Sequence, residues 1–347
     1  MIAAIYSAFG GPIEIQNVKD PTVTDNRVVI QVMATGICRS DWHGWMGHDA
    51  DITLPHVPGH ELAGVIVELG SNVQKWRKGD RVTLPFVCGC GHCLPCKSGN
   101  QQVCDNQFQP GFTHWGSFAE YVAIDYADIN LVALPENMDF VTAASLGCRF
   151  ATSFRAVKQI GQVSEGQWLA VHGCGGVGLS AIMIGKALGA RVIAIDTSDA
   201  AIRWSRKLGA DVTINPLGSS DVAAEVLSAS SGGVDVSLDA LGSIITARNS
   251  ILGLKKQGKH IQVGLMAGSE KDPPLPMDAV IGRELQIYGS HGMAAHTYPE
   301  MLSMISEGKL HPEKLIQGNV NLKEGVQLLQ IMDGFSHSGI TVITDFA

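Results

Sequence analysis

A glycine-rich hexapeptide between a buried strand and a helix constrains the fold more than any other feature. Residues 173–178 read Gly-Cys-Gly-Gly-Val-Gly and fit the pattern G-x-G-x-x-G. They follow a strand predicted at 168–172 and precede a helix predicted at 179–188. Such a turn lets a pyrophosphate approach backbone N–H groups at the start of a helix. The predicted dinucleotide contacts are Gly173, Gly175, Gly176, Val177 and Gly178.

An acidic residue follows the second predicted strand, as a dinucleotide site requires. Asp196 comes directly after the apolar run 192–195. Its carboxylate can accept hydrogen bonds from the hydroxyls of the adenosine ribose, whereas a 2′-phosphate would face its negative charge. The sequence therefore favours NAD over NADP. The alternative is a glycine turn in an α/β protein with an incidental Asp, and it leaves the coincidence of these features unexplained.

Strands and helices alternate from residue 168 to about residue 287, and this alternation predicts a parallel sheet. The next predicted helix is 200–208, which ends at Gly209. Further strands are predicted at 212–214, 234–238, 261–264 and 285–288. A parallel sheet is covered by helices on both faces, so residues 151–287 are predicted to form a doubly wound Rossmann domain of the α/β class.

The first 150 residues have a different pattern, in which short β-rich runs are separated by glycine and proline turns. Such runs lie at 28–33, 65–67, 81–84 and 118–124. Their even spacing predicts a compact, barrel-like β domain over residues 1–150. The tail is predicted to contain helices at 298–307 and 322–332 and a strand at 340–343. Periodicity alone does not assign this tail to either domain.

Composition and charge exclude several classes of function. The chain of 347 residues is 45% hydrophobic and 17% charged, which suits two folded domains. A net charge of −8 without a long basic run argues against nucleic acid or an anionic membrane as a partner. No apolar run approaches the ~20 residues of a membrane span. The N-terminus lacks the features of a signal peptide, so a cytoplasmic protein is expected.

Five of the eight cysteines crowd into one loop, at about residues 88–105. Cys90, Cys93, Cys96 and Cys104 have the spacing of a closed structural zinc site with four thiolate ligands. Cys88 offers a second register, but it lies only one residue from Cys90 and would be an awkward co-ligand. His92 could replace a thiolate, and an iron–sulfur cluster on the same thiolates is an alternative. In a reducing compartment such clustering indicates metal binding rather than disulfides.

The stretch from Cys38 to Glu61 combines a thiol, imidazoles, carboxylates and a hydroxyl, which suits a reactive metal centre. Cys38 and His60 supply two ligand types that zinc accepts. A catalytic zinc has three protein ligands and one exchangeable position. The candidates for the third ligand are Glu61, next to His60, and Cys148, and the residues alone leave this choice open. A lone cysteine in an apolar stretch is more often a small buried hydrophobe.

One motif points to a known family. Gly59, His60, Glu61, Gly64, Gly70 and Val73 reproduce the pattern G-H-E-x-x-G-x(5)-G-x-x-V. On this motif the chain resembles the zinc-containing medium-chain alcohol dehydrogenases, and the likeness covers nearly its whole length. The resemblance implies a β-rich, GroES-like catalytic domain built from residues 1–150 and 288–347, with the Rossmann domain between these segments.

The same resemblance implies roles for the metal ligands. Cys38, His60 and Cys148 would bind a catalytic zinc, Glu61 would be an occasional further ligand, and Asp41 would orient His60. With the four-cysteine loop, two zinc ions per subunit are expected.

The resemblance also implies a proton relay and the remaining cofactor contacts. Ser40 would take the proton of an alcohol and pass it through the cofactor ribose to His43 and then to solvent. The expected cofactor contacts are Arg39 at the pyrophosphate, Thr152 near the nicotinamide, and the backbone of Val263, Gly264 and Leu265 at its carboxamide. The expected walls of the substrate pocket are Phe86, Trp45 and Trp115, of which the two tryptophans could equally be core residues.

Two positions depart from the family pattern. Ala201 stands where a basic residue often contacts the adenosine ribose, and Ile340 stands where many members have an Arg that reaches the cofactor. Both departures weaken the expected grip on NAD.

These patterns together predict an enzyme. The expected reaction is the interconversion of alcohols with aldehydes or ketones by hydride transfer to and from NAD, on a small-molecule substrate. The family resemblance also implies a homotetramer. The alternatives are a polyol or other secondary-alcohol dehydrogenase on the same scaffold, and a non-catalytic redox sensor that binds zinc and nucleotide.

Overall fold

Two sheets organise the chain, one in each of two units. A computed structural model describes residues 1–266, 268–332 and 339–347. The first unit contains Met1–Ala151, Gly292–Ser306 and Pro312–Ala347, and the second contains Thr152–His291 and Glu307–His311. The predicted tail begins at residue 288, whereas the first unit resumes at Gly292. The short segment Glu307–His311 groups with the second unit.

The sheet of the second unit has six parallel strands in the order β10-β9-β8-β11-β12-β13. The strands are β8 Trp168–His172, β9 Arg191–Ile195, β10 Val212–Ile214, β11 Val234–Asp239, β12 Leu254–Gln262 and β13 Gln286–Gly289. The chain starts in the middle at β8, moves outward to β10, and returns to the other side of β8 at β11. This order is that of a doubly wound Rossmann sheet, with its topological switch point between β8 and β11. The predicted fold of this segment is confirmed.

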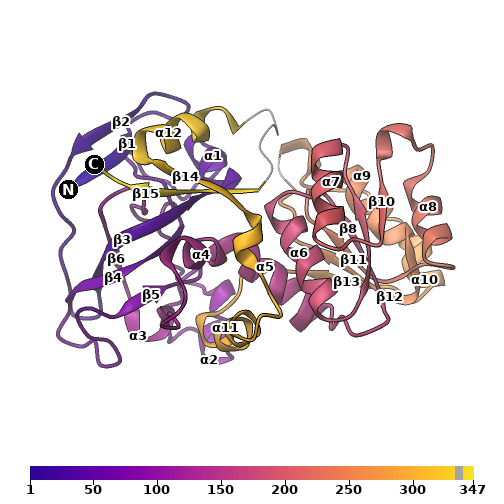
Figure 1. Cartoon of the computed structure of the whole chain (residues 1–347), viewed down its shortest axis with the longest axis horizontal. Helices are drawn as coiled ribbons and strands as arrows, with labels where there is room; N and C mark the ends of the chain where they lie inside the picture. Colours follow the sequence, from indigo (N-terminus) through magenta and orange to yellow (C-terminus); the bar gives the residue numbers. More distant parts are fainter. Residues whose placement is uncertain (267, 333–338) are drawn as a thin grey trace. The chain divides into compact units, whose positions relative to one another are not determined.

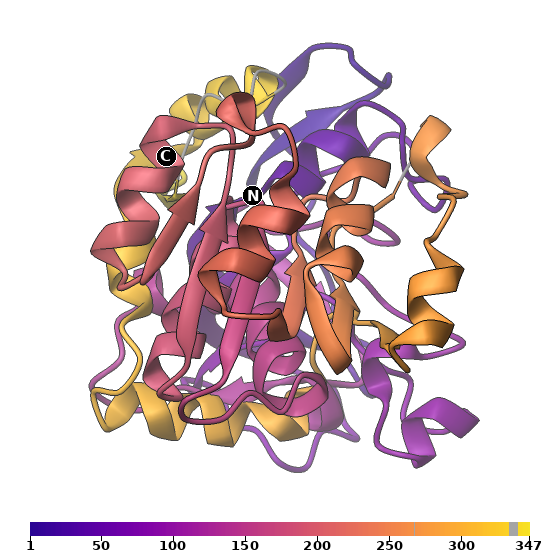
Figure 2. The same ribbon diagram turned by 90° about the vertical axis from the view of Figure 1, so that its right-hand side faces the viewer.

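Helices alternate with the parallel strands along the second unit. They are α5 Ala151–Phe154, which begins at the unit boundary, α6 Gly176–Ala187, α7 Asp199–Lys207, α8 Val222–Ala229, α9 Ile244–Leu252 and α10 Met277–Gly282. α6 packs beside α7 and α8 beside α9, and Figure 2 shows these helices against the strands of the unit. Side-chain oxygens of Ser198, Asp221 and Ser243 cap the first turns of α7, α8 and α9.

Two elements of this unit begin earlier than the sequence predicts. α6 starts at Gly176 rather than at residue 179, because its first turn is glycine-rich and carries no apolar periodicity. β12 starts at Leu254 rather than at residue 261, because residues 255–257 are polar and exposed. Both differences arise where the helix or strand lacks the apolar pattern on which the predictions depend.

The sheet of the first unit joins both ends of the chain. Its order is β14-β15-β3-β4-β5-β7, and β6 also pairs with β3. The strands are β3 Val28–Ile37, β4 Glu61–Leu69, β5 Arg81–Thr83, β6 Tyr121–Ile124, β7 Val132–Ala133, β14 Ile316–Asn321 and β15 Ile340–Asp345, with a separate hairpin of β1 Ile2–Tyr6 and β2 Ile13–Asn17. β15 runs antiparallel to β3, with Thr341 opposite Ile37. In Figure 1 the yellow β14, β15 and α12 lie beside the indigo N-terminal strands.

Short helices and one hydrophobic core complete the first unit. The helices are α1 Arg39–Trp45, α2 Leu94–Lys97, α3 Ala127–Asn130, α4 Phe140–Ala144, α11 Tyr298–Ser306 and α12 Leu322–Gln330. Wide π-helical turns occupy Leu146–Phe150 in this unit and Arg155–Ile160 in the second unit. Fully buried Ile30, Leu62 and Phe118 lie in the core that backs β3 and β4. Among the described residues, no helix has both the length and the apolar character to cross a bilayer.

Candidate metal centres and nucleotide site

Four potential metal ligands converge at the adjoining ends of β3 and β4. Cys38 follows β3 directly as the N-cap of α1, and His60 immediately precedes β4. The strands pair with Gly36 opposite Glu61, so the two ligands approach from neighbouring strands. Cys148 joins them from the π-helical turn Leu146–Phe150. One donor atom each of Cys38, His60, Glu61 and Cys148 lies within 4.8 Å of the others.

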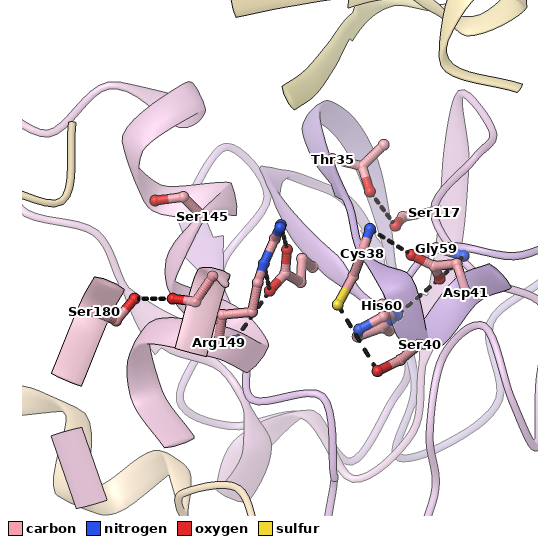
Figure 3. Close-up of polar contacts among 12 residues, drawn as sticks. Thr35, Cys38, Ser40, Asp41, Gly59, His60, Ser117, Ser145, Arg149 and Ser180 are labelled. Carbon is pink, nitrogen blue, oxygen red and sulfur yellow. Dashed lines mark hydrogen bonds and ion pairs between the residues drawn. The ribbon is translucent and has the colours of Figure 1, made fainter. Parts of the chain in front are cut away.

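Asp41 fixes the orientation of His60. Its Oδ1 lies 2.7 Å from His60 Nδ1 and accepts the backbone N–H of Gly59, while its Oδ2 accepts the backbone N–H of Cys38. Figure 3 shows the Asp41 carboxylate at the centre of these contacts. The other ring nitrogen, Nε2, is buried and has no hydrogen-bond partner among the described residues. A buried imidazole held in this way by a carboxylate suits a metal ligand.

The protonation of the cluster also fits a metal ion. A hydrogen bond from Cys148, followed by the positive charges of Arg149 and His60, lowers the pKa of Cys38 well below its ordinary value. The Cys38 thiolate and burial raise the pKa of Cys148. Burial opposes a charge on His60, yet the Asp41 carboxylate raises its pKa. These ligands must lose protons to bind a divalent cation, so binding would release protons.

A buried ion pair stands beside the four ligands. Arg149, next to Cys148, contacts both carboxylate oxygens of Glu61 through Nε and Nη2, and its backbone N–H donates to Glu61 Oε1 at 3.1 Å. Gly36 makes room for the pair, because a Cβ there would lie 2.5 Å from Glu61 Oε2. This arrangement compensates the charge of Glu61 without a metal, which suits a carboxylate that is not a permanent ligand.

The four cysteines of the predicted lobe also converge. The sulfur atoms of Cys90, Cys93, Cys96 and Cys104 lie within 4.8 Å of one another. Cys104 Sγ accepts the backbone N–H groups of Cys90 and Asn106. Although burial opposes ionisation, backbone hydrogen bonds from His92 and Cys93 lower the pKa of Cys90 to about 6. Four sulfurs with N–H donors around them suit a closed, tetrahedral metal site.

The two alternative ligands of this lobe lie outside the cluster. Cys88 is fully buried, and its thiol donates to the carbonyl of Pro85 at 3.6 Å. Burial raises its pKa, so it behaves as a core thiol. His92 Nδ1 lies 2.9 Å from the carbonyl oxygen of Cys90. The geometry therefore favours the register of four cysteines.

The stretch predicted to relay protons forms helix α1. Ser40 lies beside Cys38, with its Oγ 3.8 Å from Cys38 Sγ. His43 follows one turn later and is half-buried. Arg39 donates to the carbonyl of Met332 at 2.9 Å, and its guanidinium lies over the ring of Trp42. Its expected contact with a pyrophosphate stays a prediction.

Two phenylalanine rings flank His60. The ring of Phe86, a predicted pocket wall, lies 6.1 Å from the His60 ring, and that of Phe112 lies 5.1 Å away. Trp45 is buried in the hydrophobic core and donates to the carbonyl of Gly11. Trp115 is 38% exposed and donates to the carbonyl of Pro55. Phe112, which the sequence did not single out, therefore lies against the candidate ligand His60.

The glycine loop after β8 has the shape that a pyrophosphate needs. Gly173 has a φ of +89°, and a Cβ at Gly178 would lie 1.8 Å from the Gly173 carbonyl oxygen. A Cβ at Gly175 would meet nothing within 4 Å. The tight turn and the close approach of helix to strand thus depend on glycine, while the space beside Gly175 is open.

Asp196 and the loops after β11 and β12 lie at the same end of the parallel sheet. Asp196 accepts the backbone N–H groups of Cys174 and Ser198, both at 2.7 Å. Gly264 packs so closely on Gly242 that a Cβ there would lie 2.2 Å from the Gly242 nitrogen. These contacts order the carboxyl edge of the sheet, where doubly wound proteins bind nucleotides.

The remaining predicted cofactor residues lie as follows. The backbone N–H groups of Val263 and Gly264 donate to the carbonyl of Asp239, at 3.0 and 2.9 Å. Leu265 is exposed. Thr152 is buried, and its Oγ1 has no partner among the described residues.

Comparison with known proteins identifies the family. Residues 24–136 match the family described as alcohol dehydrogenase GroES-like domain, and residues 176–307 match zinc-binding dehydrogenase. An alcohol dehydrogenase of Geobacillus stearothermophilus is 31% identical over 93% of this chain and 94% of its own length. The chain belongs to the zinc-dependent medium-chain alcohol dehydrogenase family. It is accordingly an oxidoreductase, as the sequence predicts.

The chain is also similar to a dehydrogenase of a sugar-alcohol phosphate and to a solved alcohol dehydrogenase structure. A D-arabitol-phosphate dehydrogenase of Enterococcus avium is 33% identical over 90% of this chain and 89% of its own length. A crystal structure of an NAD-dependent alcohol dehydrogenase superposes with a TM-score of 0.89 at 28% identity, covering 99% of both chains. The predicted combination of a GroES-like and a Rossmann domain is confirmed.

Sequence reasoning missed three neighbours of the predicted catalytic ligands in this family member. They are Gly36, Arg149 and Phe112. A charged residue beside Cys148 in an otherwise apolar stretch was a signal for Arg149, because an arginine is buried only when it is paired. Gly36 and Phe112 carried no such signal, since their roles depend on the pairing of β3 with β4 and on a loop approaching His60.

Proposed function

We propose that this protein interconverts alcohols with aldehydes or ketones, using zinc and NAD. One observation supports the proposal above the others: the buried, partnerless Nε2 of His60 lies with Cys38 and Cys148 in a cluster that Asp41 orients. Two thiols and one imidazole form a catalytic zinc set with an exchangeable position. Cys38, His60 and Cys148 would hold the ion, and Glu61 would be an occasional further ligand.

The residues around the proposed ion position the substrate and move its proton. When bound, zinc supplies a Lewis acid for the substrate oxygen. Ser40 Oγ would take the proton of the substrate hydroxyl and give up its own hydrogen toward His43. The rings of Phe86 and Phe112 exclude water beside His60, which strengthens electrostatic interactions at the reacting oxygen.

The second unit is proposed to hold the cofactor. When bound, NAD supplies the hydride acceptor, and NADH the donor. The glycine loop would hold its pyrophosphate through Gly173, Gly175, Gly176, Val177 and Gly178. Asp196 would accept hydrogen bonds from the ribose hydroxyls. Arg39 would contact the pyrophosphate, Thr152 the nicotinamide, and Val263, Gly264 and Leu265 its carboxamide. The preference for NAD over NADP rests on the negative charge of Asp196.

A substrate panel with metal analysis of the same sample tests the proposed function. With NAD, at least one primary, secondary or polyhydroxy alcohol is expected to yield NADH, and the chain is expected to hold two zinc ions. Cys38→Ser is expected to remove one of them and to abolish turnover, while the zinc of the four-cysteine loop stays. Full activity of Cys38→Ser, or no turnover of any alcohol despite two bound zincs, would overturn the proposal; the latter result favours a redox sensor.

A polyol or sugar-alcohol substrate is the second candidate. The observation that favours it is the 33% identity to a D-arabitol-phosphate dehydrogenase, which is as high as the identity to the alcohol dehydrogenases. A higher kcat/KM for polyhydroxy alcohols than for simple alcohols in the same panel would support a polyol or sugar-alcohol substrate.

Three finer expectations belong to the same proposal. The second zinc is proposed to bind Cys90, Cys93, Cys96 and Cys104. A cytoplasmic location is supported by the eight free cysteines, since reduced thiol clusters persist in a reducing compartment. The homotetramer rests on the family resemblance alone, and sedimentation equilibrium of the zinc-loaded protein tests it.

A further inference from the structure

A histidine pair lies at the C-terminal end of α1, and the proposed relay uses only one member of it. Nδ1 of His43 lies 2.9 Å from Nδ1 of His48. His43 is half-buried, whereas His48 is exposed. A hydrogen bond between two such atoms requires a hydrogen on one and a lone pair on the other. The two rings therefore share one hydrogen along a line that leads from the helix to solvent.

The backbone at the end of α1 determines the position of His48 relative to His43. Gly47 has a φ of +78° and donates its N–H to the carbonyl of Gly44, while the N–H of His48 donates to the carbonyl of His43, both at 3.0 Å. These two bonds form a Schellman motif, in which the residue after the left-handed glycine returns over the last turn of the helix. His48 is thus brought onto His43 by the way in which the helix ends. The ring of Trp42 contacts both imidazoles edge-on, at 5.0 and 5.7 Å.

The charges around His43 favour passing a proton onward. Burial lowers the pKa of His43, and the positive charges of Arg39 and His48 lower it further, while Cys38 on the other side acts in the opposite direction. A proton that arrives at His43 is therefore held weakly. The nearest group that can take this proton is the imidazole of His48, whose Nδ1 lies 2.9 Å from Nδ1 of His43.

We propose that His48 is the exit of the proton relay, through which the proton of the substrate hydroxyl reaches solvent. Nε2 of His43 accepts the arriving proton, and the hydrogen on Nδ1 of His43 moves to Nδ1 of His48. Nε2–H of His48 then releases one proton to water, so one proton enters and one leaves. The exposed ring exchanges with water, which resets the tautomers of the pair. His48 acts through His43 and is a positioning residue for proton transfer; the inference rests on the proposed function.

The titration of His43 provides a test that does not depend on turnover. We would follow the imidazole ¹⁵N resonances of the full chain, loaded with zinc, across a pH series. In the wild type the resonances of the two Nδ1 atoms are expected to report the hydrogen that they share, because these atoms lie 2.9 Å apart. In His48→Gln the titration midpoint of His43 is expected to change, because the charge of the neighbouring ring is lost, and the signature of the shared hydrogen is expected to vanish. An unchanged titration midpoint of His43 in His48→Gln would contradict the proposed proton transfer between the two imidazoles.

Kinetics on an alcohol that the wild type oxidises provide the second arm. His48→Gln is expected to lower kcat by roughly three- to tenfold, a modest part of the 10²–10⁴ that general acid–base catalysis contributes. Added imidazole should restore the rate, because a small base can replace the missing ring. His296→Gln, at an exposed histidine outside the relay, should leave kcat and the imidazole response unchanged.

The outcomes separate this inference from the proposed function. If the wild-type protein turns over no alcohol, the proposed function is contradicted. If the wild type turns over an alcohol normally, the proposed function stands. If His48→Gln then has the wild-type kcat, the wild-type pH profile and no response to imidazole, only the role of His48 is contradicted.

Discussion

Asp41 shows how one buried side chain organises several others. Its carboxylate is almost fully buried and holds the backbone N–H groups of Cys38 and Gly59 together with the ring of His60. A carboxylate with three such partners positions one metal ligand by its side chain and the other by its backbone. The sequence indicated this role only through the family resemblance, and the structure adds the contacts that explain it, because a metal-binding imidazole needs an acceptor on its second nitrogen.

Replacing Asp41 with Asn should weaken the proposed catalytic zinc. The substitution keeps the shape of the side chain but removes its negative charge, so His60 loses both orientation and basicity. We expect a loss of about 10- to 100-fold in affinity for the first zinc, measured by competition with a chromophoric chelator. Asp51→Asn, at an exposed aspartate, is the control. Wild-type zinc affinity in Asp41→Asn would contradict the assigned role.

His172 should make the protein sensitive to acid. It is buried at the end of β8, its Nε2 has no partner among the described residues, and burial lowers its pKa to about 4, although Asp239 raises it. The unfolded chain binds this proton below about pH 6.5 and the folded chain does not, so stability falls as the pH drops from about 6.5 toward 4. The loss amounts to roughly 3 kcal/mol across that window.

Urea unfolding at several pH values measures this effect. His172→Gln is expected to flatten the decline in unfolding free energy between about pH 6.5 and 4, whereas His296→Gln should leave it in place. An identical pH dependence of the wild type and His172→Gln would show that the proton uptake resides elsewhere.

Strands with apolar runs were the elements most accurately predicted. β8 and β10 have the predicted bounds, β9 begins one residue earlier than predicted, and β13 is displaced by one residue. The turn Leu146–Phe150 could not be predicted, because a π-helical turn has no sequence period of its own and its geometry depends on packing. It is held from outside, since the carbonyl of Gly147 accepts the backbone N–H of Phe86 and the hydroxyl of Tyr298. Cys148 was therefore identifiable as a candidate, but its position was not.

Gly178→Ala should disrupt the junction of β8 with α6. Its Cβ would lie 1.8 Å from the carbonyl oxygen of Gly173, so the helix must move away from the strand. We expect a loss of roughly 1–3 kcal/mol in stability and a clear loss of NAD affinity, measured by calorimetric titration. Gly218→Ala, where a Cβ would meet nothing within 4 Å, is the matched control. Unchanged NAD binding in Gly178→Ala would refute the proposed pyrophosphate site.

In the protein as a whole, the two proposed metal sites have different environments. The four-cysteine loop forms its own small cluster, with Tyr126 packed against it, and apolar side chains cannot replace the ion there. The sequence indicated that these four cysteines would converge, because they fall within 15 consecutive residues, from Cys90 to Cys104. The pairing of Glu61 with Arg149 joins residues 88 positions apart, and no local pattern indicates such a contact.

Cys96→Ser should remove the metal of this loop and lower the stability of the protein. A closed structural site contributes its binding energy to folding, so we expect the thermal midpoint to fall by several degrees and one zinc to be lost. Cys88→Ala removes a buried thiol outside the cluster and should retain both zincs. Metal analysis and calorimetry of the two variants check this, and loss of zinc from Cys88→Ala instead would reverse the assigned register.

The central position of β15 bears on how the protein is made. This strand lies between β14 and β3, beside the end of β3 that leads into Cys38. During synthesis the parallel sheet from β8 to β13 emerges from the ribosome as a continuous segment and can fold at once. The sheet of the first unit is complete only after β15 has left the exit tunnel. We therefore expect the second unit to fold while the edge of β3 beside Cys38 is still uncovered, and zinc to bind Cys38 late in synthesis.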